Sequence, residues 1–306
     1  MNSCSIIKTT LFPLLLFPLL LFGGVQGDFF RACLHGDIEK VLILHEKEGM
    51  RLLFARDKDG NTPLHLACCS KKGGNKKEIV SFLISKGVDI NATCNDGATP
   101  LIVAVSNGNF EAAELLVKAP TIQINKAFNH GLTPLHVAVI NRFSPLISLI
   151  LSHPECNPNF GTRDGATPLH FAAMIQHVEE ARLLIQDRRV DLNAPQHDAT
   201  YSGATPLHFA AMQAQTEIVK MMLQRGGVNV KATLTTGGYD GFTPLHFVVL
   251  NPDTVNVFET AKMLLRAGAN PKYKSSLGKT PFDLTNVSII QNLLKNPKME
   301  YLSSEK

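Results

Sequence analysis

The sequence predicts an all-α protein built as a stack of repeated helical units, and three observations support this class. The ten residues GATPLHFAAM occur twice, at 165–174 and at 203–212. A Thr-Pro signature, in most copies followed by Leu-His, recurs seven times along the chain. Each signature is followed by a second apolar segment with helical periodicity and then by turn residues. Self-similarity at a period of roughly 35 residues indicates a repeat architecture, in which each unit buries its apolar face only against its neighbours.

The signatures are regularly spaced from residue 62 to residue 280. Successive threonines lie 37, 34, 34, 38, 38 and 37 residues apart, at Thr62, Thr99, Thr133, Thr167, Thr205, Thr243 and Thr280. A threonine before proline predicts a helix start, because its hydroxyl can accept a bond from a free backbone N–H and proline at the first helical position sacrifices no hydrogen bond. The small residues of LHxAA then let neighbouring helices approach closely.

The remainder of each unit reads as a second helix and a turn. Ile218, Val219, Met222 and Leu223 share one helical face. Glycine closes the second helix in SKGVDINA (85–92), QRGGVNVKA (224–232) and RAGANPKY (266–273), since glycine adopts the left-handed geometry of a helix end without strain.

This pattern resembles the ankyrin repeat, which consists of two helices and a finger-like loop. The resemblance covers residues 28–306 and implies an ankyrin-repeat solenoid of about eight units with β-turn fingers. Residues 28–56 resemble a truncated first unit, and 277–306, with TPFDLT in place of TPLH, a closing unit. Ankyrin-like proteins bind other proteins through a concave face and need no cofactor, so the resemblance implies a protein partner, no catalysis and a monomeric chain.

Residues 1–27 differ from the rest of the chain and predict a secretory signal peptide. One lysine, Lys8, precedes an apolar run at 11–22, and GGVQG follows with small residues before a cut at Gly27/Asp28. Twelve helical residues reach about 18 Å, short of the about 30 Å of a hydrocarbon layer. We therefore expect a secreted or periplasmic protein, and the alternative is a membrane-anchored scaffold that retains residues 6–25. An exported ankyrin-like protein favours a bacterial source.

Composition argues against several other classes of protein. The chain of 306 residues has a net charge of +4, no tryptophan and four tyrosines, and its densest basic stretch is KKGGNKK at 71–77. Neither a nucleic-acid surface nor an aromatic stacking platform for bases is expected. Adjacent Cys68 and Cys69 and an odd cysteine count after residue 27 do not form a disulfide framework. We expect Cys33 and Cys68 to be small buried groups.

A histidine recurs in five of the signatures, at His65, His136, His170, His208 and His246. A metal array is one interpretation, but stacked helices lie about 8–10 Å apart, whereas zinc–nitrogen bonds are about 2 Å long. No HExxH motif or paired CxxC is present. We therefore expect a structural role, in which each imidazole bonds to nearby backbone or to the threonine hydroxyl, and no metal.

Departures from the repeat indicate where a partner binds. The segment from Ala92 to Thr99 spans seven residues, but Ala194 to Thr205 and Ala232 to Thr243 each span eleven. These two long fingers, 193–203 and 231–241, each carry a tyrosine. With residues near the ends of the first helices, they form the predicted partner-binding set: Met174, Ile175, His197, Tyr201, Met212, Gln213 and Tyr239. Tolerated loop insertions are the alternative.

The sequence also allows an enzymatic function, an accessory function and glycosylation. An enzyme would need a site among His197, Asp198, Lys231, Tyr201, Tyr239 and Asp240, the ionisable groups of the two fingers; no third partner for His197 and Asp198 is identifiable. An accessory protein that protects or delivers an exported enzyme differs from the favoured function only in its partner. Asn91 and Asn286 lie in N-x-S/T sequons, although Asn91 is also the repeat's ordinary asparagine.

Overall fold

The computed structural model describes residues 24–69 and 76–297, and the chain divides at Asn157/Pro158 into two compact units. The N-terminal unit contains α2 (Gly24–His35), α3 (Ile38–Glu48), η1 (Gly49–Leu52), α4 (Pro63–Cys68), α5 (Lys76–Ser85), α6 (Pro100–Ser106), α7 (Phe110–Val117), η2 (Asn129–Gly131), α8 (Pro134–Ile140) and α9 (Ser144–Ser152). The described residues form no β-strand, and one isolated bridge joins Phe128 to Leu132. The predicted all-α class is confirmed.

The C-terminal unit continues the same pattern of helix pairs. It contains α10 (Pro168–Met174), α11 (Val178–Gln186), α12 (Pro206–Met212), α13 (Thr216–Arg225), η3 (Gly237–Tyr239), α14 (Pro244–Val248), α15 (Thr254–Arg266), η4 (Pro281–Leu284) and α16 (Ser288–Lys295). The described helices pair into eight layers, from α2 with α3 to η4 with α16, which agrees with the expected number of units.

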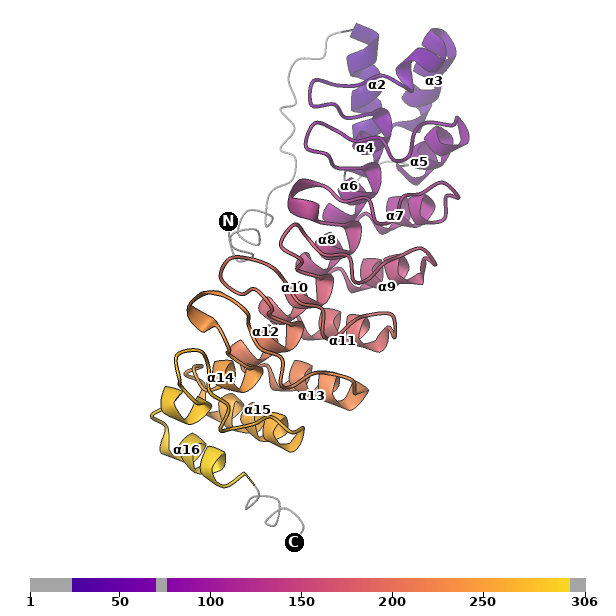
Figure 1. The fold of residues 1–306 in the computed structure, drawn as a ribbon. Helices are drawn as coiled ribbons and strands as arrows, with labels where there is room; N and C mark the ends of the chain where they lie inside the picture. Colours follow the sequence, from indigo (N-terminus) through magenta and orange to yellow (C-terminus); the bar gives the residue numbers. More distant parts are fainter. Residues whose placement is uncertain (1–23, 70–75, 298–306) are drawn as a thin grey trace. The chain divides into compact units, whose positions relative to one another are not determined.

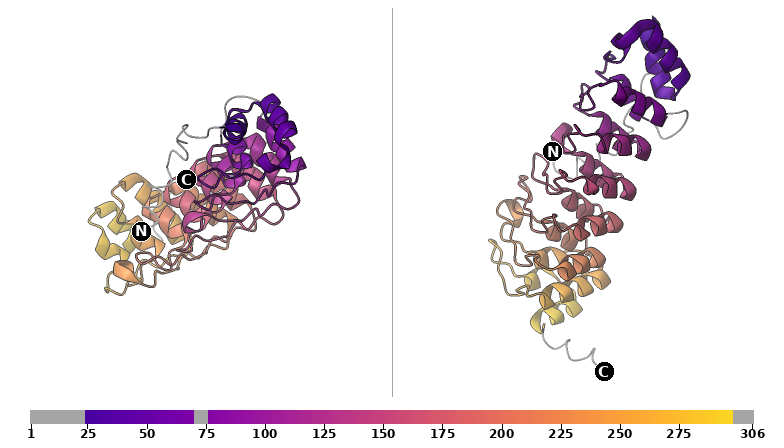
Figure 2. Two further views of the ribbon diagram at one scale, coloured as in Figure 1. Left: turned by 90° about the horizontal axis from the view of Figure 1, so that it is seen from above. Right: turned by 90° about the vertical axis from the view of Figure 1, so that its right-hand side faces the viewer.

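Within each unit the helices form two rows. The first helices stack on one another, as α4, α6 and α8 do in one unit and α10, α12 and α14 in the other. The second helices form a parallel row, α5, α7 and α9 or α11, α13 and α15 (Figure 1). The loops between layers project to one side of the helices in each unit (Figure 2). We call the first row the inner helices, the second row the outer helices, and the loops fingers.

The inner helices begin as the sequence predicts. Each Thr-Pro threonine is extended at the N-cap with proline at the next position, as Thr205 is before Pro206. In five layers the histidine three residues later completes a reciprocal cap with that threonine. Ile102 takes this place after Thr99, and Asp283 takes it after Thr280. From Thr62 to Thr243, each helix start is followed within six residues by buried leucine and alanine or phenylalanine side chains, so the capped helix contributes directly to the core.

The N-terminal boundary differs from the expectation of a unit that starts at Asp28. Helix α2 begins at Gly24, Gly27 is buried within it, and Gln26 Nε2 donates to the Arg56 carbonyl at 3.2 Å. The last four residues of the predicted signal segment therefore form the first turn of a described helix. Residues 1–23, which hold the apolar run, lie outside the described residues, as do 298–306 of the closing unit. No helix in the described part of the chain has the length and apolarity to cross a membrane.

Candidate functional site

The histidines join each layer to the next one. In His170 the Nδ1 atom accepts from the Thr167 backbone N–H at 3.0 Å, and Nε2 lies 3.1 Å from the Ala204 carbonyl, directly before the next signature threonine. Because a carbonyl only accepts, Nε2 must carry the proton and the ring must be neutral. The same contact links His65 to Ala98 and His246 to Lys279, at 3.1 to 3.2 Å. His208 Nε2 instead lies 3.1 Å from the carbonyl of Ala232, in the finger that follows its own outer helix. The predicted structural role is confirmed, and it extends across layers.

Burial keeps these imidazoles neutral. It lowers the pKa of His65 and of His170 from 6.5 to about 4, and that of His208 to about 3. Among the described residues, no group of three or more His, Cys, Asp or Glu is placed to hold a metal ion. Cys33 and Cys68 are fully buried, as expected, and burial raises the pKa of both thiols.

Asparagines form a second set of links between layers, which the sequence analysis did not identify. Asn193 Nδ2 donates to the Gly227 carbonyl at 2.7 Å, and its Oδ1 accepts from the Asn229 N–H at 2.7 Å. Asn91, Asn125 and Asn159 each make the equivalent pair of bonds to the layer that follows. Asn91 therefore uses its amide structurally, as the sequence favoured, whereas Asn286 is exposed.

The two long fingers bring their tyrosines together. Tyr201 and Tyr239 stack with ring centroids 5.7 Å apart and planes inclined by 8°. Tyr201 also meets the edge of Phe209 at 5.7 Å, and Tyr239 lies 5.3 Å from both Phe242 and Phe247. Each aromatic pair contributes about 0.5–1.5 kcal/mol beyond its buried area. The four extra residues of each finger thus fold the tyrosines onto the inner helices.

Polar bonds within the fingers hold this arrangement. The carboxylate of buried Asp198 accepts from the backbone N–H groups of Thr200 and Tyr201 and from Gln196 Nε2, so it shapes the turn that carries Tyr201. Thr235 N donates to the Ser202 carbonyl at 2.8 Å, which ties one long finger to the other. Asp198 is therefore a structural residue, and His197 beside it is exposed and packs over Gly165.

The stacked tyrosines form one wall of a pocket of about 220 Å³ on the inner helices of the C-terminal unit. This aromatic pocket is lined by Tyr201, Met212, Tyr239, Phe247, Leu250, Asn251 and Pro252. Asn251 Nδ2 donates to the Met212 carbonyl at 2.9 Å and so connects the ends of α12 and α14. None of these described lining residues is acidic or basic.

Three of the seven predicted partner-binding residues meet in the aromatic pocket, namely Tyr201, Met212 and Tyr239. Met174 and Ile175 lie half-buried one layer away at the end of α10, and Gln213 bonds through its side chain to Gln176 at 3.2 Å. Four of the predicted residues, Met174, Ile175, Gln213 and exposed His197, therefore do not line the pocket.

Sequence reasoning missed four lining residues, Phe247, Leu250, Asn251 and Pro252. A signal for two of them exists in the repeat register. Met174, Met212 and Leu250 each lie seven residues after a signature threonine, and Gln213 and Asn251 lie eight residues after one. Only the tertiary structure places the NPDTV insertion (251–255) beside the tyrosines, because α14 is short and ends at Val248.

Stacked helix pairs with capped starts and projecting fingers define this protein as a helical repeat protein. A family model described as ankyrin repeats (3 copies) matches residues 29–94, 72–161, 135–233 and 192–275. The chain belongs to the ankyrin-repeat family. This membership indicates a protein–protein interaction module.

Curated relatives match only part of their own length. The probable 26S proteasome regulatory subunit p28 of Saccharomyces cerevisiae is 35% identical over 94 residues, which is 29% of this chain and 39% of that protein. A putative ankyrin repeat protein of Rickettsia bellii is 37% identical over 87 residues, 28% of this chain and 45% of that one. The matched part of the Drosophila melanogaster channel TRPA1 spans 7% of the channel. The chain thus spans less than half the length of these relatives.

Solved structures share the fold. The ankyrin repeat domain of Bcl-3, described as a unique member of the IkappaB family, superposes with a TM-score of 0.65 at 26% identity, and the match covers 78% of this chain and all of that domain. The human ASB11 ankyrin repeat domain gives a TM-score of 0.55 at 24% identity, over 77% of this chain and 97% of that one.

Proposed function

We propose that this chain is an exported interaction protein that binds a partner protein through the aromatic pocket and performs no catalysis. The main support for this proposal is the stacked pair Tyr201–Tyr239 beside Met212 and part-exposed Leu250. This pair lies where two successive fingers are lengthened. Tyrosine and methionine supply adaptable apolar contact area, and binding hot spots concentrate in such clusters.

The partner implied by this pocket presents an apolar or aromatic side chain. The pocket walls are aromatic and aliphatic, with the Tyr hydroxyls and the Asn251 amide as the polar groups at hand. The absence of charged side chains from the lining means that shape and apolar burial would dominate affinity there. Yeast p28, a relative named as a probable regulatory subunit of the proteasome, is consistent with a role in protein assembly.

A binding experiment with matched tyrosine variants tests the proposed site. The full chain is used to capture partners, and affinity for the retained protein is then compared between wild type, the double variant Tyr201→Ser/Tyr239→Ser and the control Tyr273→Ser, which changes a tyrosine in the next finger. The double variant should bind at least about tenfold more weakly, and the control should change affinity less than about twofold. Equal binding by the double variant, with its fold shown intact by circular dichroism, would exclude the pocket. Shortening both fingers by four residues is an independent second test.

N-terminal sequencing tests export. The protein is isolated from the organism that produces it. A mature chain that starts at or near Asp28 supports the secretory proposal, and a chain with its N-terminus intact in a membrane fraction supports the tethered alternative. Since α2 begins at Gly24, cleavage at Gly27/Asp28 would remove its first turn and the Gln26–Arg56 bond. Cleavage before Gly24 would preserve both.

A further inference from the structure

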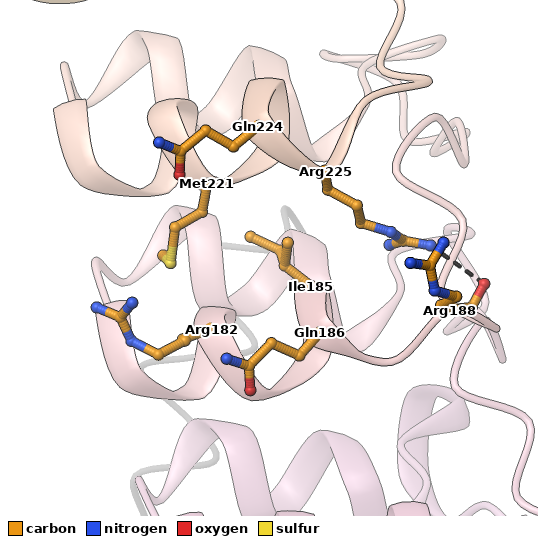
Figure 3. A pocket seen from close by; sticks show the side chains of 7 residues that line it. All are labelled: Arg182, Ile185, Gln186, Arg188, Met221, Gln224 and Arg225. Carbon is orange, nitrogen blue, oxygen red and sulfur yellow. Dashed lines mark hydrogen bonds between the residues drawn. The ribbon is translucent and has the colours of Figure 1, made fainter.

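A second pocket lies on the outer helices of the C-terminal unit and has different chemistry. It has a volume of about 360 Å³ and lies between α11 and α13 (Figure 3). Three guanidinium groups and two amides line it, those of Arg182, Gln186, Arg188, Gln224 and Arg225. No carboxylate occurs among these described lining residues. We call this pocket the arginine groove.

The groove has cationic groups at two separate places with apolar side chains between them. Arg182 lies at one end and Arg188 and Arg225 at the other, with Ile185 and Met221 in the middle (Figure 3). Ile185 is buried and Met221 is part-exposed, so the groove has an apolar floor.

Arg225 has unused hydrogen-bonding capacity in this groove. Its Nη2 atom donates to the carbonyls of Arg188 and Val190, at 3.1 and 2.7 Å, which fixes the guanidinium at the end of α13. Its Nη1 atom is buried and has no hydrogen-bond partner among the described residues. A buried charged donor without a partner is unfavourable, and an anionic oxygen is the group that satisfies it best.

One carboxylate near this end of the groove, that of Asp187, makes its side-chain hydrogen bonds with Arg189 and interacts with Arg225 only at longer range. Asp187 is engaged by Arg189, whose Nε and Nη2 donate to its two oxygens at 3.1 and 2.6 Å. The Arg189 guanidinium holds the pKa of Asp187 below its usual value, and Arg225 adds to this at longer range. At the other end, Glu179 lies 3.4 Å from Arg182, but this pair is exposed and an incoming ligand can displace it.

We propose that the arginine groove binds an acidic segment of a partner protein, with carboxylates at its two cationic ends and an apolar side chain over Met221. Guanidinium groups bind carboxylates through paired, directional bonds, which favours this ligand over a neutral segment. The apolar floor between the two ends favours a peptide over a small inorganic anion. This site belongs to the outer helices, whereas the aromatic pocket belongs to the inner helices and fingers, so the two proposals stand independently.

Fluorescence anisotropy with short labelled peptides tests the proposal on the full chain. The probe is the peptide Asp-Glu-Leu-Glu-Asp, and the control peptide is its amide counterpart Asn-Gln-Leu-Gln-Asn. The variants are Arg188→Glu, which reverses an exposed charge in the groove, and Lys220→Glu, which makes the same change on α13 outside the lining. Arg225 is left unchanged because it supports the backbone, and thermal unfolding verifies each variant's fold.

The expected pattern is specific to the groove. The acidic peptide should bind more tightly than its amide counterpart, Arg188→Glu should weaken it at least about tenfold, and Lys220→Glu less than about twofold. Met221→Gln should weaken it about threefold, because the apolar floor is lost. Equal binding of both peptides, or equal weakening by both charge reversals, overturns the proposal. Inorganic phosphate that binds with the same dependence on Arg188 while the peptide does not also overturns it.

Discussion

The two compact units of this chain share one scaffold and differ in what they expose. Both contain threonine-capped inner helices, histidines bonded to the next layer and asparagines that link successive fingers. Seven residues after the signature threonine, however, the N-terminal unit has Cys69, Ser106 and Ile140, and the C-terminal unit has Met174, Met212 and Leu250 before its closing layer, which has Val287. The stacked tyrosines and the arginine groove also lie in the C-terminal unit.

This difference separates residues that build the stack from residues that recognise something else. Residues with a scaffold role must repeat, because each layer presents the same surface to the next. A recognition residue has no such constraint and stands out as a departure from the repeat.

Acidification should destabilise the protein strongly, and the C-terminal unit most. Burial lowers the pKa of His170 to about 4 and of His208 to about 3, and it also lowers that of His246; His65 in the N-terminal unit falls to about 4. Below pH 6.5 the unfolded chain binds protons that the native chain does not, so the free energy of unfolding falls as pH falls from about 6.5 to about 3, the folded pKa of His208.

The upper limit of this loss is roughly 3 kcal/mol for His65 or His170 and roughly 5 kcal/mol for His208, at about 1.36 kcal/mol per pKa unit. Urea unfolding between pH 7.5 and pH 4 measures it, and hydrogen exchange resolves the two units. His35→Asn, at an exposed histidine, is the control and should keep the wild-type profile. A stability that does not change between pH 6.5 and 4.5 would contradict the assignment of neutral, buried imidazoles.

Glycine to alanine substitutions in the turns should have unequal costs in the two units. Gly97 and Gly241 have positive φ values of 80° and 75°, so alanine is strained at both. A Cβ at Gly241 would lie 2.8 Å from Ser276 N, whereas at Gly97 its nearest neighbour is Phe128 Cβ at 3.8 Å. We expect Gly97→Ala to cost about 1–2 kcal/mol from backbone strain and Gly241→Ala to cost more. Chemical denaturation measures the free energy of unfolding of both variants. Equal losses would show that the backbone at Ser276 moves to accommodate the Cβ at residue 241.

Loss of one asparagine link should destabilise either unit by a similar amount. Asn193→Ala removes the bonds to Gly227 and Asn229, and Asn125→Ala removes those to Glu155 and Asn157. About 1–2 kcal/mol is expected for each, as two half-exposed bonds are lost. Asn286→Ala, at an exposed position, serves as the control with a negligible change in the denaturation midpoint. A large difference between the two link variants would mean that the scaffold is less uniform than its sequence.

Substitution of Leu250 should have the smallest effect on stability. This side chain is 46% exposed at the rim of the aromatic pocket, so Leu250→Gln should change the free energy of unfolding by no more than about 0.5 kcal/mol. Leu245→Gln, in the fully buried interior of α14, should cost several kcal/mol. Partner affinity should fall in Leu250→Gln despite its normal stability, and a loss of stability there would place Leu250 in the scaffold instead.

Much of the fold could be predicted from the sequence because its determinants are local. Thr205 followed by Pro206 dictates a helix start, and Gly226 with φ of 79° marks a helix end, wherever they occur. Repetition then predicts the stack. The start of α2 at Gly24 could not be predicted, because the glycines and small residues before Asp28 also satisfy the pattern of a cleavage site.

The candidate site was predictable only in part. Unusual finger length and the tyrosines pointed to Tyr201 and Tyr239, and the helix register pointed to Met212. Leu250 and Asn251 share the register of Met212 and Gln213, but Pro252 belongs to an insertion with no distinguishing pattern and lines the pocket because α14 ends early. The arginine groove has no sequence motif, since Arg182, Arg188 and Arg225 come from two layers and meet only after these layers stack.

The sequence by itself determined the repeat, the helix boundaries at the threonines and the structural role of the histidines. These features depend on backbone geometry and on contacts that recur at one spacing, so a single chain displays them. The tertiary structure alone decided which side chains meet across layers, such as Tyr201 on Tyr239, Asn251 on Met212 and Arg225 on Arg188. Those contacts depend on the lengths of fingers and helices and on the packing of adjacent layers, which no local pattern encodes.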